Sequence, residues 1–343
     1  MSSPSNRPAS TMMVVVAFAI VYIVWGSTYF FIRMSVEHIP PMMVGVLRFL
    51  LAGALMLLWC LFTKETLFSW KVMRPAIVSG LLLLGFGNGA LIWSEQYIPS
   101  SLAAILLAAG PVWFVVLDKG KWKENFRSRS TIFGLVVGLG GVLLVFAEQL
   151  RGVVSAGSGG TGAADGAGTG AAAGSGRHME MVALVVLVLG SISWASGSLY
   201  SKYKSVSGSS NAVNAGWQMF AAGVAFIPAS LLSGEWSKFH PSAVAFSSWI
   251  GIVYLVTMGS LVGYSAFVWL LQVRPATQVS THAYVNPVVA VLLGVFFAGE
   301  RMSVLQLTGL AVILISVLLI NLSKYRSGLP AGRKAGRKAI ATE

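Results

Sequence analysis

Charged side chains are rare inside the long apolar runs of this sequence, and Arg48 is the clearest exception. A guanidinium inside a hydrocarbon layer is costly unless it meets a partner or water. We therefore expect Arg48 to hold an anionic substrate group such as a carboxylate. The alternatives are that its long side chain reaches the outer lipid headgroups, or that it forms a structural pair with Glu95.

Two titratable residues stand where they could take up and release a proton. His282 lies within an apolar run, and a histidine near its ordinary pKa of about 6.5 can relay a proton. Glu95 follows another such run. Both are candidates for proton coupling, and His282 is also a candidate substrate contact. The alternative for His282 is a neutral ring that is hydrogen-bonded to a neighbouring carbonyl.

Pro111 and Pro287 each fall in the middle of an apolar run. Proline removes a helical hydrogen bond and frees the carbonyl four residues earlier, which in lipid must face a cavity or find a partner. We expect a pair of broken, cavity-lining helices that contact substrate. The alternative is a packing kink. Further polar and aromatic side chains near the midplane could serve a ligand or a partner helix: Asn88, Tyr264, Tyr284 and Asn286.

The composition requires a membrane. Only 10% of residues are charged, 56% are hydrophobic, and the mean hydropathy is +0.77, whereas a soluble domain has about 25% charged residues. The single cysteine, Cys60, excludes a disulfide framework and any cysteine-based metal centre. Without a phosphate loop, a metal cluster or a catalytic Ser/His pair, the sequence predicts no enzyme, no cofactor and no metal site.

Ten uncharged or nearly uncharged runs are long enough to cross a bilayer as helices. They predict an all-α polytopic membrane protein with ten transmembrane helices. The runs are 12–32, 41–63, 75–94, 98–117, 130–147, 181–201, 210–232, 248–272, 276–297 and 303–323.

Lysine and arginine are distributed unequally between the loops. With the terminal segments included, eighteen fall on one predicted side and five on the other. The positive-inside rule places both termini in the cytoplasm of a cell whose inner membrane holds the protein. The net charge of +13 is explained by this pattern, so no nucleic-acid partner is expected; lipid and a small-molecule substrate are. Residues 324–343 form a basic cytoplasmic tail.

The two halves of the chain resemble each other. Residues 96–99 and 272–275 both read Gln-x-x-Pro, residues 48–53 align with 218–223, and Pro111 matches Pro287. The Gly/Ala/Ser-rich segment 151–180 predicts an external linker between repeats at 1–150 and 181–323. An odd number of spans per repeat inverts the second copy, an architecture typical of alternating-access transporters. Repeat-related residues are candidate outer and inner gates: Trp25, Ser27 and Tyr29, and Trp194, Ser196 and Tyr200.

An ordered set of motifs resembles the EamA branch of the drug/metabolite transporter superfamily. It consists of Trp25-Gly26-Ser27-Thr28-Tyr29-Phe30, Pro40-Pro41, Leu47-Arg48-Phe49, Tyr284-Val285-Asn286-Pro287-Val288 and Gly299-Glu300-Arg301. The resemblance implies a ten-helix, two-repeat exporter of metabolites such as amino acids. The first half departs from the pattern, because Asp118-Lys119-Gly120-Lys121-Trp122-Lys123-Glu124 stands where similar proteins repeat Gly-Glu-Arg.

The sequence thus predicts a secondary active transporter that exports amino acids or drug-like solutes, with proton coupling as an option. The alternative is a passive facilitator, channel or exchanger. Monomer and homodimer are both compatible with the small-residue face at Gly134 and Gly138.

Overall fold

The computed structural model describes residues 10–127, 129, 132–144, 170–204, 210–274, 279 and 282–327, and every regular element in these ranges is a helix. Seven helices are long and apolar enough to cross a membrane. Three shorter apolar helices, Ile132–Leu144, Val285–Phe297 and Val304–Ser316, lie within the fifth, ninth and tenth predicted spans.

The helices of the first half follow the predicted spans closely. α1 is Thr11–Val36, and the second span joins α2 (Pro41–Gly45), the π-helical segment η1 (Val46–Leu50) and α3 (Leu51–Phe62). The third span joins α4 (Trp70–Gly80), the π-helical η2 (Leu81–Asn88) and α5 (Gly89–Ser94). Then come α6 (Ser100–Leu107), α7 (Gly110–Leu117), the short η3 (Lys119–Lys121) and α8 (Trp122–Arg127).

The second half repeats this order. It contains α10 (Gly170–Lys204), α11 (Asn211–Leu232), the short α12 (Glu235–Lys238) and η4 (Pro241–Ala243). Then α13 (Phe246–Tyr254), the π-helical η5 (Leu255–Tyr264) and α14 (Ser265–Val273) form one span, followed by α16 (His282–Phe297) and α17 (Val304–Ser327). α10 begins at Gly170, inside the segment predicted as linker, because its first residues include an alanine run that favours helix.

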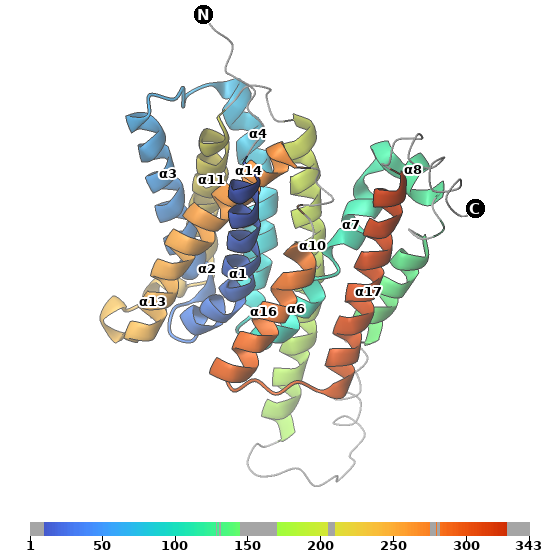
Figure 1. Ribbon diagram of the computed structural model, residues 1–343. Helices are drawn as coiled ribbons and strands as arrows, with labels where there is room; N and C mark the ends of the chain where they lie inside the picture. Colours follow the sequence, from blue (N-terminus) through green and yellow to red (C-terminus); the bar gives the residue numbers. More distant parts are fainter. Residues whose placement is uncertain are drawn as a thin grey trace, which may run out of the picture.

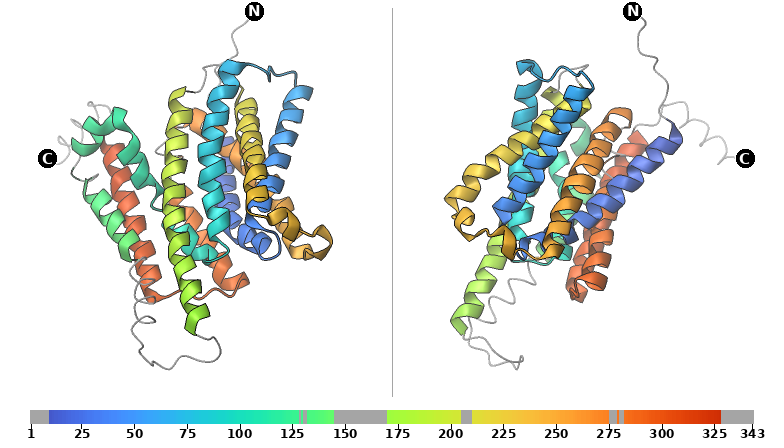
Figure 2. Two further views of the ribbon diagram at one scale, coloured as in Figure 1. Left: turned by 180° about the vertical axis from the view of Figure 1, so that it is seen from behind. Right: turned by 90° about the vertical axis from the view of Figure 1, so that its left-hand side faces the viewer.

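The two halves are interleaved rather than placed side by side. α1 packs against α13, η5, α14 and α16 of the second half, whereas α10 packs against α4, η2, α5, α6 and α7 of the first. α1 begins and α17 ends on the same side of the bundle, and α10 runs opposite to α1 (Figure 1). Both further views show the same arrangement (Figure 2).

Spans two and seven cross at matched glycines. A Cβ added to Gly53 would lie 2.4 Å from the Phe220 backbone N, and one added to Gly223 would lie 2.4 Å from the Leu50 backbone N. Neither position can hold a larger residue without moving the other helix. Each half therefore supplies the same small residue to the same contact.

The two mid-span prolines behave differently. α6 ends at Leu107 and α7 begins at Gly110, with Pro111 in its first turn, so the fourth span is broken as predicted. Pro287 instead lies inside the continuous helix α16. The expected pair of broken helices is therefore wrong for the second copy as the structure describes it, because proline removes one hydrogen bond while the surrounding helix persists.

Candidate substrate site

Arg48 is buried inside the bundle and bridges two other spans. Its side chain is 4% exposed. Nε donates to the Ser260 hydroxyl at 3.1 Å, and Nη1 donates to the Asn88 side-chain oxygen at 3.2 Å. The side chain therefore does not reach the headgroups. Within the described ranges, no carboxylate accepts a hydrogen bond from Arg48, so the structural pair with Glu95 is not formed either.

All three groups of this bridge stand on π-helical segments. Arg48 belongs to η1, Asn88 ends η2, and Ser260 lies in η5. A π-helical turn shifts side chains around the helix axis and is frequent at functional sites. η1 packs against η5, so three non-standard segments from three spans bring a cation and two neutral polar groups together. A buried cation held only by neutral groups is available to an anionic ligand.

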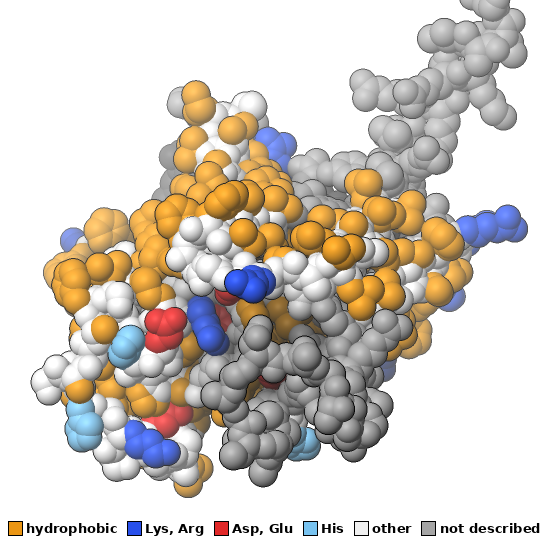
Figure 3. Space-filling view, turned by 90° about the horizontal axis from the view of Figure 1, so that it is seen from below, with side chains coloured by type: hydrophobic (Ala, Val, Ile, Leu, Met, Phe, Trp, Pro, Cys, Tyr) orange, Lys and Arg blue, Asp and Glu red, His pale blue; other side chains and the backbone are white. Residues whose placement is uncertain are grey.

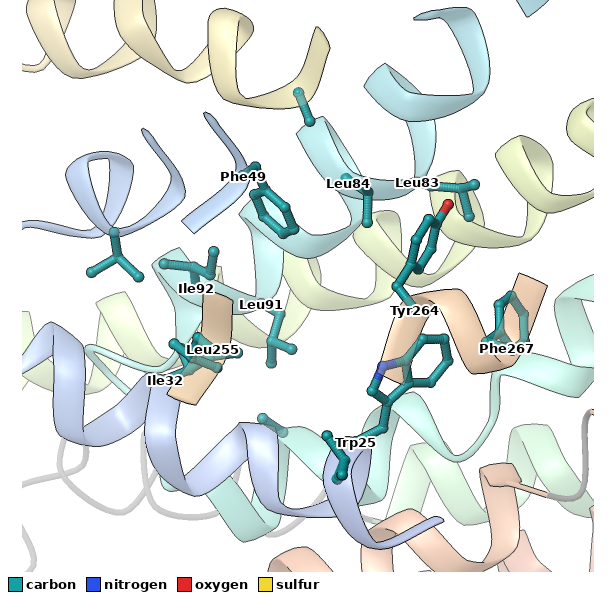
Figure 4. Packing of buried hydrophobic residues seen from close by; sticks show 14 of the residues in the cluster. Trp25, Ile32, Phe49, Leu83, Leu84, Leu91, Ile92, Leu255, Tyr264 and Phe267 are labelled. Atoms are coloured by element: carbon teal, nitrogen blue, oxygen red, sulfur yellow. The ribbon is translucent and has the colours of Figure 1, made fainter. Parts of the chain in front are cut away.

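Aromatic rings from four helices surround Trp25. Its ring centroid lies 4.7 Å from Phe267, 5.4 Å from His282, 6.0 Å from Trp194 and 6.4 Å from Tyr264. Figure 4 shows Trp25 of α1 beside Tyr264, with Phe267 further along the same span. The rings of Trp25 and Trp194, which the sequence analysis placed at candidate outer and inner gates, lie together in this aromatic cluster.

The aromatic cluster adjoins Arg48 through Gly259. The Trp25 indole N–H donates to the Gly259 carbonyl at 3.2 Å. A Cβ added to Gly259 would lie 3.3 Å from Arg48 Nη2 and 3.1 Å from the Thr28 methyl. The glycine therefore lets the guanidinium and the aromatic cluster approach the same stretch of η5. A charged group and a set of rings thus adjoin one another in the middle of the bundle.

A second polar network is centred on Gln218 of α11, a residue that the sequence analysis did not predict as part of a site. The Tyr264 hydroxyl donates to Gln218 Oε1, and Gln218 Nε2 donates to the Ser79 hydroxyl at 2.9 Å. Gln218 is 4% exposed, so these bonds satisfy an amide that would otherwise be costly to bury. Its alignment with Arg48 was a signal that could have identified it.

Several predicted contacts are occupied by structural hydrogen bonds. The Ser27 hydroxyl donates to the Val24 carbonyl at 2.8 Å and lies 2.6 Å from the Tyr254 hydroxyl. The Ser196 hydroxyl donates to the Ile192 carbonyl at 2.8 Å. The Ser196 bond lies within α10, whereas Ser27 also links α1 to α13 through Tyr254. Tyr29 and Tyr200 are half-buried.

Span nine supplies a histidine and an asparagine with local partners. His282 Nδ1 lies 2.8 Å from the Val279 carbonyl. With its side-chain amide turned so that both the oxygen and the nitrogen are satisfied, Asn286 donates to the His282 carbonyl at 3.1 Å and to the Tyr22 carbonyl at 3.2 Å. Pro287 is buried next to it. The side chain of Tyr284 lies outside the described residues.

Among the candidates whose side chains the structure describes, Glu95 is the one with buried polar atoms that have no hydrogen-bond partner. It is fully buried, and neither carboxylate oxygen has a hydrogen-bond partner among the described residues. Arg33 donates to its backbone carbonyl instead of its carboxylate. Burial raises the pKa of Glu95 well above its ordinary value, and the negative charge of Glu300 adds to this, against the opposing charges of Arg33 and Arg48. A carboxyl group in this setting favours its protonated form.

Comparison with known proteins decides the family. The sequence profile of the EamA-like transporter family matches residues 12–147 and 181–322, one segment on each side of the Gly-rich region. The chain belongs to the EamA-like transporter family. This agrees with the resemblance seen in the ordered motifs around Trp25, Arg48 and Asn286.

Curated relatives that align over most of the chain include an inner membrane transporter and a probable efflux pump. The inner membrane transporter YedA of Escherichia coli K12 is 34% identical over 312 residues, which is 89% of each chain. A probable amino-acid metabolite efflux pump of the same strain is 24% identical over 322 residues, covering 90% of this chain and 94% of its own. Protein PecM of Dickeya dadantii is 24% identical over 301 residues, 87% and 89% of the two chains.

A solved crystal structure has the same fold. It aligns with a TM-score of 0.58 at 16% identity and covers 91% of this chain and 98% of its own. Since the family is one of transporters, and two of these relatives are named as a transporter and an efflux pump, the EamA-like chain is a membrane transporter. Its buried polar groups are contacts for transport or for helix packing.

Proposed function

We propose that this EamA-like transporter is a secondary carrier that exports small metabolites bearing a carboxylate, such as amino acids, by alternating access. The observation that carries the proposal is the buried Arg48 guanidinium, whose two hydrogen bonds go to the neutral groups Ser260 and Asn88. A carboxylate can pair with the two nitrogens of a guanidinium in one plane. The aromatic cluster beside it would receive an apolar part of the solute.

Alternating access is supported by the repeated packing of the two halves. One family profile matches both segments, the Gly53 and Gly223 contacts are equivalent, and α1 and α10 each pack into the opposite half. Two inverted copies of one unit offer two near-equivalent gates around one site. We infer ten transmembrane helices in two inverted repeats.

Proton coupling through Glu95 is the energy source that we propose. A fully buried carboxyl group without a hydrogen-bond partner in the described ranges can accept and release a proton at little cost to packing. His282, the other candidate, already has a carbonyl partner. In vesicles with an acidic interior, protons leaving through the carrier should therefore drive uptake of solute against its own gradient. A pH-sensitive dye reports the proton flux.

Counterflow in proteoliposomes tests the carrier. Vesicles are loaded with one unlabelled amino acid from a panel, and uptake of the labelled form is measured. A carrier shows trans-stimulation by internal solute, because the loaded site returns faster than the empty one. Equal uptake into loaded and empty vesicles would contradict the proposal and favour a passive facilitator or channel.

Orientation is proposed from the charge distribution, with both termini in the cytoplasm. Reporter fusions after Ser69 and at the C-terminus should report a cytoplasmic location, and a fusion in the Gly-rich segment should report an external one. A cytoplasmic report from the Gly-rich segment would contradict the proposed orientation.

A further inference from the structure

Two glutamates of the second half hold the starts of two helices of the first half. Glu300, before α17, accepts hydrogen bonds from the Ser100 N–H at 2.9 Å, the Ser100 hydroxyl at 2.7 Å and the Ser101 N–H at 3.0 Å. Glu235 of α12 accepts one from the Met43 N–H at 2.9 Å. We name these contacts the Glu300 clasp and the Glu235 clasp.

Each clasp joins the two halves through groups that need a partner. The first N–H groups of a helix have no acceptor within the helix, and the N-terminal end carries partial positive charge. A carboxylate from the other half satisfies both. Glu235 is 7% exposed, so separating the halves here would leave a buried carboxylate and free N–H groups until water reached them. All hydrogen bonds of a clasp should therefore break together when it opens.

Both clasps lie on the same side of the bundle. α2 and α6 begin there, and α11 and α16 end there (Figure 1). Viewed from this side, charged and histidine side chains gather on one part of a face that is otherwise largely hydrophobic (Figure 3). The proposed orientation makes this the external side.

The opposite side carries a counterpart of the Glu235 clasp. The alignment of residues 48–53 with 218–223 continues to pair Lys64-Glu65 with Gly234-Glu235. The backbone repeats as well, because Lys64 has φ +58° and Gly234 has φ +67°, each directly before its glutamate. Glu235 holds the start of span two, so the two-fold counterpart of this contact joins Glu65 to the start of α11.

That counterpart contact is open in this structure. Glu65 is exposed. No hydrogen bond joins Glu65 to α11 among the described residues, although the carbonyl of the neighbouring Leu67 accepts one from the Trp217 indole N–H at 3.1 Å. The carboxylate contact is thus made on one side of the bundle and not at the equivalent place on the other, where the loop already lies against α11.

We propose that Glu235 and Glu300 latch the external gate, that Glu65 latches the cytoplasmic gate on the first turn of α11, and that the two sets of contacts are mutually exclusive. This inference rests on the proposed alternating-access function. When the cytoplasmic side closes, the N–H groups at the start of α11 donate to Glu65. The Glu235 and Glu300 clasps then open, and Met43, Ser100 and Ser101 face water.

Pairs of spin labels test this exclusion directly. In a Cys60→Ser background, an external pair is placed at Gln96 and Ser237, and a cytoplasmic pair at Thr66 and Asn211. Distances are measured by pulsed electron paramagnetic resonance in liposomes without substrate. Because no transport is measured, an error in the proposed substrate would leave these distances unchanged.

The glutamate variants should move the two distances in opposite directions. Glu235→Ala with Glu300→Ala removes both acceptors and should lengthen the external distance and shorten the cytoplasmic one, with about a tenfold change in the ratio of the two states, which corresponds to ~1.4 kcal/mol. Glu65→Ala should favour the state described here. Glu37→Ala, at an exposed glutamate on the external side, is the matched control and should change neither distance.

Two results would overturn the proposal. If both distances lengthen together in the double variant, the clasps only stabilise the fold. If neither distance differs from the wild type, the clasps do not control the gates. A third measurement guards against misfolding, because the double variant should elute as wild type in size-exclusion chromatography.

Discussion

The two halves of this transporter place equivalent polar residues in equivalent contacts but give them different charge. Arg48 reaches Asn88, and its counterpart Gln218 bonds to Tyr264. Asn88 and Tyr264 are separated by the same interval as Pro111 and Pro287. The same alignment pairs Glu95 with Leu271. At these matched positions, the first half therefore carries ionisable groups, and the second half carries neutral ones, of which Gln218 and Tyr264 bond to each other.

This difference separates framework from function. A pseudo-two-fold framework needs equivalent residues of the two halves to make equivalent contacts, as Arg48 with Asn88 and Gln218 with Tyr264 do. A site that is charged at one end and neutral at the other would bind a charged solute in a single orientation. Experiments that erase the charge difference should remove transport, whereas experiments on the neutral half should affect stability.

The largest effect is expected at Glu95. Glu95→Gln keeps the shape of the side chain and removes its proton site, so it should abolish uptake driven by a pH gradient while exchange between equal pools continues. His282→Gln is the matched comparison, and its transport, even if weaker through altered solute binding, should still respond to the pH gradient. Proteoliposome assays of both modes give the answer, and equal loss of both modes in Glu95→Gln would assign the residue to folding.

Arg48→Gln makes the two polar centres alike. Transport of carboxylate solutes should fall by about 100-fold in kcat/KM, equivalent to ~2.8 kcal/mol, because the solute loses its charged partner. Arg48→Lys should recover only part of this, since an ammonium lacks the planar fork. Arg301→Gln, an exposed arginine, is the control. Normal transport by Arg48→Gln would make the residue structural.

Gln218→Leu tests the neutral centre. Removing the amide leaves the Tyr264 hydroxyl without its acceptor and the Ser79 hydroxyl without its donor, which should lower the free energy of unfolding by ~1–3 kcal/mol. Selectivity among carboxylate solutes should stay as in the wild type. Thermal unfolding in detergent measures the first quantity and competition assays the second. Altered selectivity would place Gln218 in the substrate site.

The smallest effect concerns the Glu235 clasp and pH. Burial raises the pKa of Glu235, although hydrogen bonds from the Met43 and Met42 backbone and the Ser233 side chain, and the charge of Lys238, act in the opposite direction. A raised pKa in the clasped state means that this state binds the proton more tightly than the open state, where Glu235 meets water. Lowering the pH through the range just above the ordinary glutamate value should therefore favour the clasped state. The external label pair reports it, and Glu235→Gln should remove this contribution.

Much of the architecture was predictable because its causes are local. Long uncharged runs predicted the helices, and the isolated charge of Arg48 predicted a buried residue with a special environment. The matching segments singled out Trp25, and its place near the midplane singled out Tyr264. The structure brings both into one aromatic cluster.

The rest depends on contacts between distant parts of the chain. No residue type marks a π-helical turn, so the segments that aim Arg48, Asn88 and Ser260 at one another left no signal. The hydrogen bonds of Glu235 and Glu300 join residues 192 and 200 positions apart, since each runs from the second half to the start of a helix of the first. Contact between Trp25 and Trp194 likewise required the interleaving of the halves.

The crossing at Gly53 and Gly223 limits how the two copies can evolve. Gly53 meets the backbone of Phe220, and Gly223 meets the backbone of Leu50, which aligns with Phe220. A larger side chain in one copy would therefore collide with the other copy. Mutations after duplication could change charge at Arg48 and Gln218 independently, because those side chains have separate partners. At the crossing, a larger residue in either copy would need a compensating shift in both. Side-chain charge at the polar positions can therefore change independently in the two halves, whereas side-chain volume at the crossing can change only in both together.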